Sequence, residues 1–74
     1  MIYKTIGAIE NALERKFTQY QKKERIVKEL RLICEFYPTE KNNILLESAK
    51  REANLAFEVC LELQILHKDL IKKQ

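Results

Sequence analysis

The sequence contains almost none of the residues that interrupt helices. Gly7 is the only glycine and Pro38 the only proline in 74 residues, and charged or aliphatic side chains fill most other positions. Glycine and proline are the residues that a helix interior tolerates least, whereas leucine, lysine, glutamate and arginine are good helix formers. The composition therefore predicts an all-α fold. The length allows one domain, which we assign to residues 1–74.

Side chains that bind metals or carry out catalysis are also scarce. His67 is the only histidine, and Cys34 and Cys60 are the only cysteines. Both cysteines lie in apolar helical patterns, so we expect reduced, buried thiols and neither a zinc site nor a disulfide. Ser48 and His67 are 19 residues apart on one predicted helix, and a single glycine cannot build a phosphate-binding loop. We therefore expect a binding protein with no cofactor, not an enzyme, and a packing or inter-subunit role for His67.

Long apolar runs and a strong charge imbalance are absent as well. No apolar stretch approaches the roughly 20 residues that a membrane span needs. The segment from Met1 to Lys4 lacks a basic head followed by an apolar run, so we expect no signal peptide and a cytosolic protein. The net charge of +3 is too small for a protein that binds duplex DNA. The excess lies in the first half, where residues 1–37 carry eight Lys/Arg against five Glu.

The clearest predicted element is a long C-terminal helix over residues 39–72. Pro38 ends the preceding helix, Thr39 is a suitable N-cap, and Glu40 adds an acidic group to the first turn. Apolar and small residues then recur at alternating spacings of three and four, which is the pattern of a packed helix–helix seam. This seam comprises Leu46, Ala49, Ala53, Ala56, Cys60, Leu63, His67 and Leu70.

The apolar surface of this helix is wider than one partner helix can cover. A surface helix needs an apolar arc of about 100°, but here further apolar residues flank the seam on both sides. We therefore predict a homo-oligomer. The flanking residues are Leu55, Val59 and Leu66 on one side and Phe57, Leu61 and Ile71 on the other.

The first half of the chain allows two interpretations. The preferred one is a short helix over residues 5–16 and a second helix over residues 22–37, because two aromatic residues and one β-branched residue weaken helix propensity at 17–20. The two helices would form a helical hairpin with the C-terminal helix. The alternative is one helix from Thr5 to Phe36, giving a simple hairpin that dimerises into a four-helix bundle. The inward residues would be Ile6, Ile9 and Leu13, then Ile26, Leu30, Ile33 and Tyr37, flanked by Val27 and Cys34.

Three segments within residues 15–60 resemble a known family. The chain is similar to the small phage anti-CBASS sponges, whose helical-hairpin domain is shared with the Thoeris-inhibiting sponges. It departs from them in the very short connection after Tyr20, in Leu55-Ala56-Phe57 where the family has a tryptophan-containing stretch, and in lacking a terminal Arg-Asn tail. The matching segments are Arg15-Lys16-Phe17-Thr18-Gln19-Tyr20; Lys22-Lys23-Glu24-Arg25 with Leu32-Ile33; and Pro38 with Leu45, Ser48 and Glu52-Ala53.

The resemblance implies a protein that sequesters cyclic nucleotide signals in the cytoplasm of a phage-infected bacterium and so blocks CBASS immunity. Expected ligands are cyclic dinucleotides such as cyclic GMP-AMP, and cyclic trinucleotides. The expected assembly is a hexamer, or at least a dimer, with the site between protomers. Aromatic rings would stack on the bases and cations would bind the phosphates. The candidate ligand-binding residues are Tyr3 or Tyr20 for stacking, Lys23 and Arg25 for phosphates, with Lys22 in reserve, and Thr18 for a base edge or phosphate.

A different function remains open from the sequence alone. The long seam and the mild basic excess also suit a helical-hairpin regulatory protein that forms a four-helix-bundle dimer and binds a protein or an RNA. The two functions differ in assembly size and in their response to cyclic dinucleotides.

Overall fold

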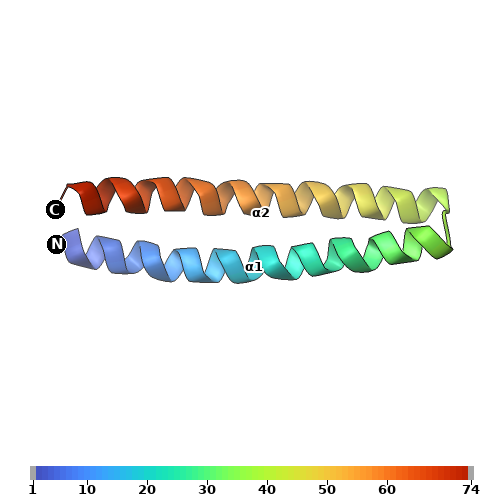
Figure 1. The fold of residues 1–74 in the computed structure, drawn as a ribbon, viewed down its shortest axis with the longest axis horizontal. Helices are drawn as coiled ribbons and strands as arrows, with labels where there is room; N and C mark the ends of the chain where they lie inside the picture. Colours follow the sequence, from blue (N-terminus) through green and yellow to red (C-terminus); the bar gives the residue numbers. More distant parts are fainter. Residues whose placement is uncertain (1, 74) are drawn as a thin grey trace.

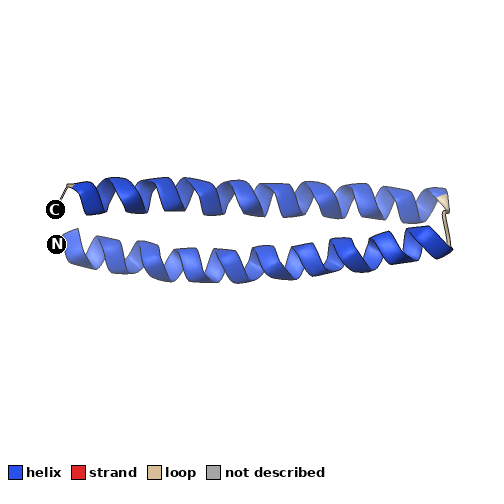
Figure 2. Ribbon diagram, viewed as in Figure 1, coloured by secondary structure: helices blue, strands red, loops and turns tan. Residues whose placement is uncertain are grey.

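The computed structural model describes residues 2–73, and side chains from Lys4 to Lys73. Helix α1 (Ile2–Phe36) and helix α2 (Glu40–Lys72) run antiparallel and are joined by residues 37–39 (Figure 1). The hairpin measures 53 × 14 × 13 Å, and its two termini lie at the same end (Figure 1). Residues 2–73 contain no strand (Figure 2). The predicted all-α hairpin is thus confirmed.

The connection between the two helices contains the predicted N-cap of α2, Thr39. Thr39 has extended backbone dihedral angles, and its hydroxyl oxygen accepts a 3.1 Å hydrogen bond from the Asn42 backbone N–H. The Asn42 side-chain amide donates to the Tyr37 carbonyl at 2.9 Å, and the Thr39 backbone N–H donates to the same oxygen at 2.8 Å. These bonds use polar groups that a helix end otherwise leaves unpaired. They fix the point at which the chain reverses.

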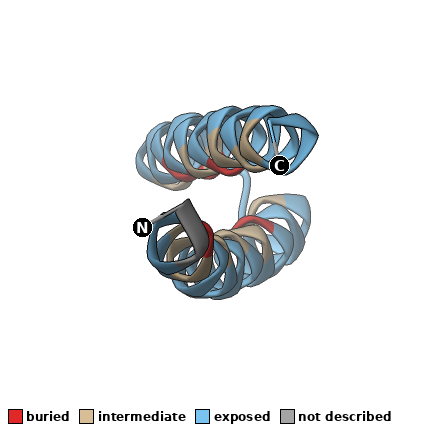
Figure 3. Cartoon of the chain, turned by 90° about the vertical axis from the view of Figure 1, so that its left-hand side faces the viewer, coloured by how far each residue is buried: buried red, intermediate tan, exposed pale blue. Residues whose placement is uncertain are grey.

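The seam predicted for α2 is also confirmed. Ala49, Ala53 and Cys60 are buried, and the other five seam residues are half-buried. Viewed along the long axis, the buried residues lie on the facing sides of the two helices (Figure 3). Small alanine side chains let the two backbones approach closely, and Val27 of α1 packs against Ala49 and Ala53.

The predicted break at residues 17–20, with a separate N-terminal helix over 5–16, is wrong. Helix α1 is continuous from Ile2 to Phe36. The β-branched Thr18 fits because its hydroxyl donates to the Glu14 carbonyl one turn earlier, at 2.9 Å. Residues 17–20 contain neither glycine nor proline. Tyr20 packs against Phe57 of α2. Tertiary packing therefore outweighs the weak local propensity.

Continuity of α1 also changes which residues face α2. Ile26, Ile33 and Tyr37 were predicted to point inward, but they are 49%, 43% and 68% exposed, whereas Val27 is 3% exposed and Cys34 half-buried. One uninterrupted helix must keep a single phase, and Ile6, Leu13, Tyr20, Val27 and Cys34 follow each other at steps of seven residues. Leu30, which was also predicted to point inward, is half-buried and packs against the core. The stripe predicted for a separate helix over 22–37 was therefore correct at Leu30 and wrong at Ile26, Ile33 and Tyr37.

The core of the hairpin is small. Among the described side chains none is less than 2% exposed, and the buried hydrophobic ones are Ile6, Val27, Ala49, Ala53 and Cys60. Both cysteines were predicted to be buried, and Cys60 is, whereas Cys34 is half-buried; both are free thiols. Neither helix, over the residues described, is long and apolar enough to cross a membrane.

Candidate functional site

The seam divides the surface of the hairpin into two unlike flanks. One, the charged flank, carries Glu24 and Arg31 of α1 and Lys50 of α2, which line a common groove over Val27 and Ala53. The other, the apolar flank, carries Leu55 and Val59 of α2, which line a groove of about 310 Å³ with Lys16, Gln19, Lys23, Glu52 and Ala56. Each flank therefore offers a different surface chemistry to a ligand or a partner.

Aromatic rings meet on the charged side of the seam. The Tyr20 ring centroid lies 5.5 Å from that of Phe57 and 6.3 Å from that of Phe17, and both pairs are tilted. Tilted pairs at these distances are favourable arrangements of the ring quadrupoles. Tyr20 is half-buried, so the packing fixes the place of its ring while part of the side chain stays accessible.

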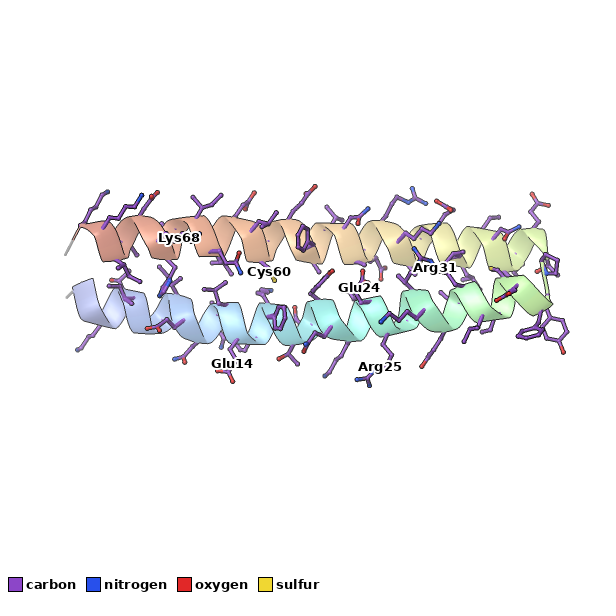
Figure 4. All side chains as sticks on the ribbon, in the orientation of Figure 1. Glu14, Glu24, Arg25, Arg31, Cys60 and Lys68 are labelled. Atoms are coloured by element: carbon purple, nitrogen blue, oxygen red, sulfur yellow. The ribbon has the colours of Figure 1, made fainter. Side chains whose placement is uncertain are left out.

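A shallow depression of about 420 Å³ begins at Tyr20 and continues along α1. Arg25 follows Gln21 by four residues and Lys28 follows Arg25 by three, so helical periodicity places these side chains along one strip of the surface. Arg25 projects away from α2 (Figure 4). The depression offers one phenol ring, one amide and two cations, with Glu24 as the opposing charge. Its lining residues are Tyr20, Gln21, Glu24, Arg25 and Lys28.

The residues proposed from the sequence are distributed over the surface. Tyr20 and Arg25 come together in the depression. Lys23 lies in the groove of the other flank, where its ammonium is 3.4 Å from a carboxylate oxygen of Glu52. The Thr18 hydroxyl bonds to the backbone of its own helix. Lys22 is exposed and lines neither hollow, and the side chain of Tyr3 lies outside the described residues.

Three lining residues, Gln21, Glu24 and Lys28, were not among the site residues predicted from the sequence. Gln21 and Lys28 share the depression with Arg25. Their position could have been predicted from the sequence, because Gln21 precedes Arg25 by four residues and Lys28 follows it by three, which places all three on one side of an unbroken helix. The predicted break before residue 22 separated Gln21 from Arg25, whereas Lys28 was overlooked although it follows Arg25 by three residues in the same predicted helix.

The remaining ionisable groups make no compact reactive cluster. His67 is half-buried in the seam, and its Nε2 atom is 3.8 Å from a Glu10 carboxylate oxygen, which is beyond hydrogen-bonding distance. Within the part of the chain that the structure describes, no group of three or more His, Cys, Asp or Glu residues could hold a metal ion.

No model of a known protein family matches the chain, and no curated protein or solved structure is significantly similar to it.

Proposed function

We propose that this hairpin is a non-enzymatic binding protein that sequesters cyclic dinucleotides, or cyclic trinucleotides, in a phage-infected bacterial cell and so blocks CBASS signalling. The observation that carries the proposal is the depression in which Arg25 and Lys28 stand beside Tyr20. The resemblance of residues 15–60 to phage sponge proteins supports the same ligand class.

The chemistry of the depression matches the chemistry of such a ligand. A cyclic dinucleotide has flat bases and two phosphodiester anions. The Arg25 guanidinium can form two parallel hydrogen bonds to a phosphate, and the Lys28 ammonium adds a point charge. The accessible part of the Tyr20 ring gives a base a surface to stack on, and such stacking contributes about 1–3 kcal/mol per base.

The charge of one depression is too small for the whole ligand. Arg25 and Lys28 supply two positive charges and Glu24 removes one, so one chain faces two phosphates with a net charge of +1. Two chains that bind the ligand from opposite sides would neutralise it. The proposed site therefore includes a second subunit, in keeping with the two-fold symmetry of a cyclic dinucleotide.

Two unlike flanks also suit the hexamer that the resemblance implies. A closed hexamer with two-fold and three-fold axes needs two different contacts on each subunit, whereas a dimer needs one. The charged and apolar flanks offer two distinct surfaces for these contacts. Measurement of the native mass, with and without ligand, distinguishes a dimer from a hexamer.

Isothermal titration with a panel of cyclic dinucleotides, including the cyclic GMP-AMP isomers, tests the proposal. We expect binding at micromolar concentration or better and recovery of intact ligand after denaturation. Absence of binding across the panel, or recovery of a cleaved product, would contradict it. Arg25→Ala and Lys28→Ala should each weaken binding about tenfold or more, because each removes a charge-assisted hydrogen bond.

Matched variants locate the ligand on the surface. Arg15→Ala removes an exposed cation from the same helix outside the depression, so it should bind as the parent does. Lys23→Ala tests the groove on the apolar flank. If Lys23→Ala abolishes binding while Arg25→Ala and Lys28→Ala do not, the ligand lies in that groove and not beside Tyr20.

A second candidate function is a helical-hairpin regulatory protein that binds another protein. The unbroken α1 favours it, because a plain hairpin with exposed apolar side chains presents a long surface to a partner helix. A dimer that ignores every cyclic dinucleotide but binds a defined host protein would support this function over the first.

A further inference from the structure

We propose that the apolar flank is covered by a second copy of this chain, packed face to face so that two hairpins form a four-helix bundle. The flank is extended here to Ile26 and Ile33 of α1 and to Leu45, Leu55, Val59 and Leu66 of α2, which are 38–62% exposed. The proposal concerns the flank opposite the depression and does not depend on any ligand.

Seven-residue spacing places these side chains on one continuous face. Residues 19, 26 and 33 of α1 lie one heptad apart, as do residues 45, 52, 59 and 66 of α2. In packed helices, a step of seven residues returns to nearly the same face. Gln19, Glu52 and Val59 line one groove, which fixes the two rows on the same side of the seam. The apolar flank therefore extends from near the turn at Ile33 and Leu45 to the open end of the hairpin at Leu66.

The opposite flank does not show this pattern. Glu24, Arg31 and Lys50 stand beside the seam there, and burying those charges against a second hairpin would be costly. A four-helix bundle needs a flat, mainly apolar face on each hairpin. The apolar flank provides such a face at Ile26 and Ile33 of α1 and along α2 from Leu45 to Leu66.

The exposed area of the chain is large for its mass. The hairpin exposes 6122 Å², whereas a folded monomer of this mass is expected to expose about 4,800 Å². The excess is about 1,300 Å². A stable interface commonly removes about 800 Å² from each partner, and permanent dimers remove more. An interface that removes about 1,300 Å² from each chain would bring the exposed area to the level of an ordinary small protein.

The charges on the apolar flank are complementary between two copies. Lys23 and Glu52 form a 3.4 Å ion pair at the edge of the groove, with their side chains 38% and 62% exposed. In a two-fold interface each such pair occurs twice, so an ammonium of one copy can pair with a carboxylate of the other. The long lysine stems of Lys16 and Lys23 can lie along the apolar surface while their charged ends stay in water. These polar groups therefore do not prevent face-to-face packing.

Adjacent residues provide matched tests on both helices. Ile33→Glu and Leu66→Glu place a carboxylate on the apolar flank. Leu32→Glu and Ile65→Glu place it one residue away, on the outer side of the same helices, where the parent side chains are 56% and 61% exposed. Every variant adds one negative charge, and one isoleucine and one leucine are replaced on each side, so net charge is matched and helix propensity is matched over the two pairs.

Sedimentation velocity and native mass spectrometry measure the outcome. The parent chain should sediment as a dimer or as a larger even-numbered assembly. Ile33→Glu and Leu66→Glu should weaken assembly at least about a hundredfold, because each dimer would bury two unpaired carboxylates. Leu32→Glu and Ile65→Glu should assemble as the parent does. Circular dichroism at high protein concentration then distinguishes a folded monomer from an unfolded chain.

Three results would overturn the proposal. They are a monomeric parent at about 100 µM, where even a micromolar dimer is well populated; equal loss of assembly in all four variants; and loss only in the outer-side variants. Failure of ligand binding in a protein that still dimerises would count against the proposed function and leave this interface intact.

Discussion

Lys23 shows how far the role of a side chain depends on the face of the helix that it occupies. In the sequence it stands three residues from Tyr20 and two from Arg25, which suggests a common site. In the structure it lies in the groove of the apolar flank and pairs with Glu52. A phosphate at Lys23 would therefore compete with that carboxylate. Arg25 has no such partner among the described side chains, which is why the proposed function assigns the phosphate to Arg25.

Thr39 is the side chain that defines the start of α2, and its removal should have a measurable cost. Thr39→Ala deletes the hydroxyl oxygen that accepts from the Asn42 N–H. We expect the free energy of unfolding to fall by about 1 kcal/mol. Thr39→Ser keeps the cap and should stay close to the parent. Urea unfolding followed by circular dichroism measures both, and equal stability of the alanine and serine variants would show that the cap contributes little.

His67 is the polar member of an otherwise apolar or small α2 seam. Its Nε2 atom is buried without a hydrogen-bond partner, 3.8 Å from Glu10. A buried polar group without a partner lowers stability by about 1–3 kcal/mol. His67→Leu should therefore raise the free energy of unfolding by about 1 kcal/mol, and His67→Gln should not. A lower melting temperature for the leucine variant would contradict this expectation. It would mean that the contact with Glu10 stabilises the hairpin by more than the burial of the His67 imidazole destabilises it.

At the scale of whole elements, α2 could be predicted from the sequence and α1 only in part. The start of α2 at Thr39 and its eight seam residues were predicted because proline, a cap and strict spacing all indicate the same helix. In α1 the local propensity at 17–20 and the overall periodicity disagreed. The continuity of α1 through residues 17–20 is supported by Phe57, which is distant in sequence and packs on Tyr20. Propensity alone could not reveal that contact.

The continuity of α1 can be tested with a substitution that a loop would tolerate. Thr18→Pro removes the backbone N–H of residue 18 and places the proline ring against the Glu14 carbonyl. In a helix interior this should cost about 3 kcal/mol or more. Thr18→Ala loses only the hydroxyl bond to Glu14 and improves helix propensity, so its stability should be unchanged or rise by a few tenths of a kcal/mol. Thermal unfolding of the two variants gives the comparison, and a well-tolerated proline would indicate a break in α1.

At the scale of the whole molecule, the hairpin has a small core and exposes many large apolar side chains. A chain of this size is only marginally stable alone. Its described core consists of five side chains, two of them alanine, while many large apolar residues remain exposed on both helices. From the sequence, the width of the apolar arc on α2 predicts self-association, and this stays a prediction. The sequence could not identify the face, because the phase of α1 relative to α2 appears only once the two helices are packed.

If a second copy supplies the missing burial, folding and assembly are coupled, and stability must depend on concentration. For a folded dimer that unfolds to two chains, each tenfold dilution lowers the free energy of unfolding by about 1.4 kcal/mol of dimer. Melting followed by circular dichroism, over two decades of protein concentration, should therefore show a steadily falling midpoint. Leu66→Glu should melt lower and lose this dependence, whereas Ile65→Glu should retain it. A parent whose midpoint is constant under dilution, with a sedimentation coefficient of a single chain, would show that the two helices are stable by themselves.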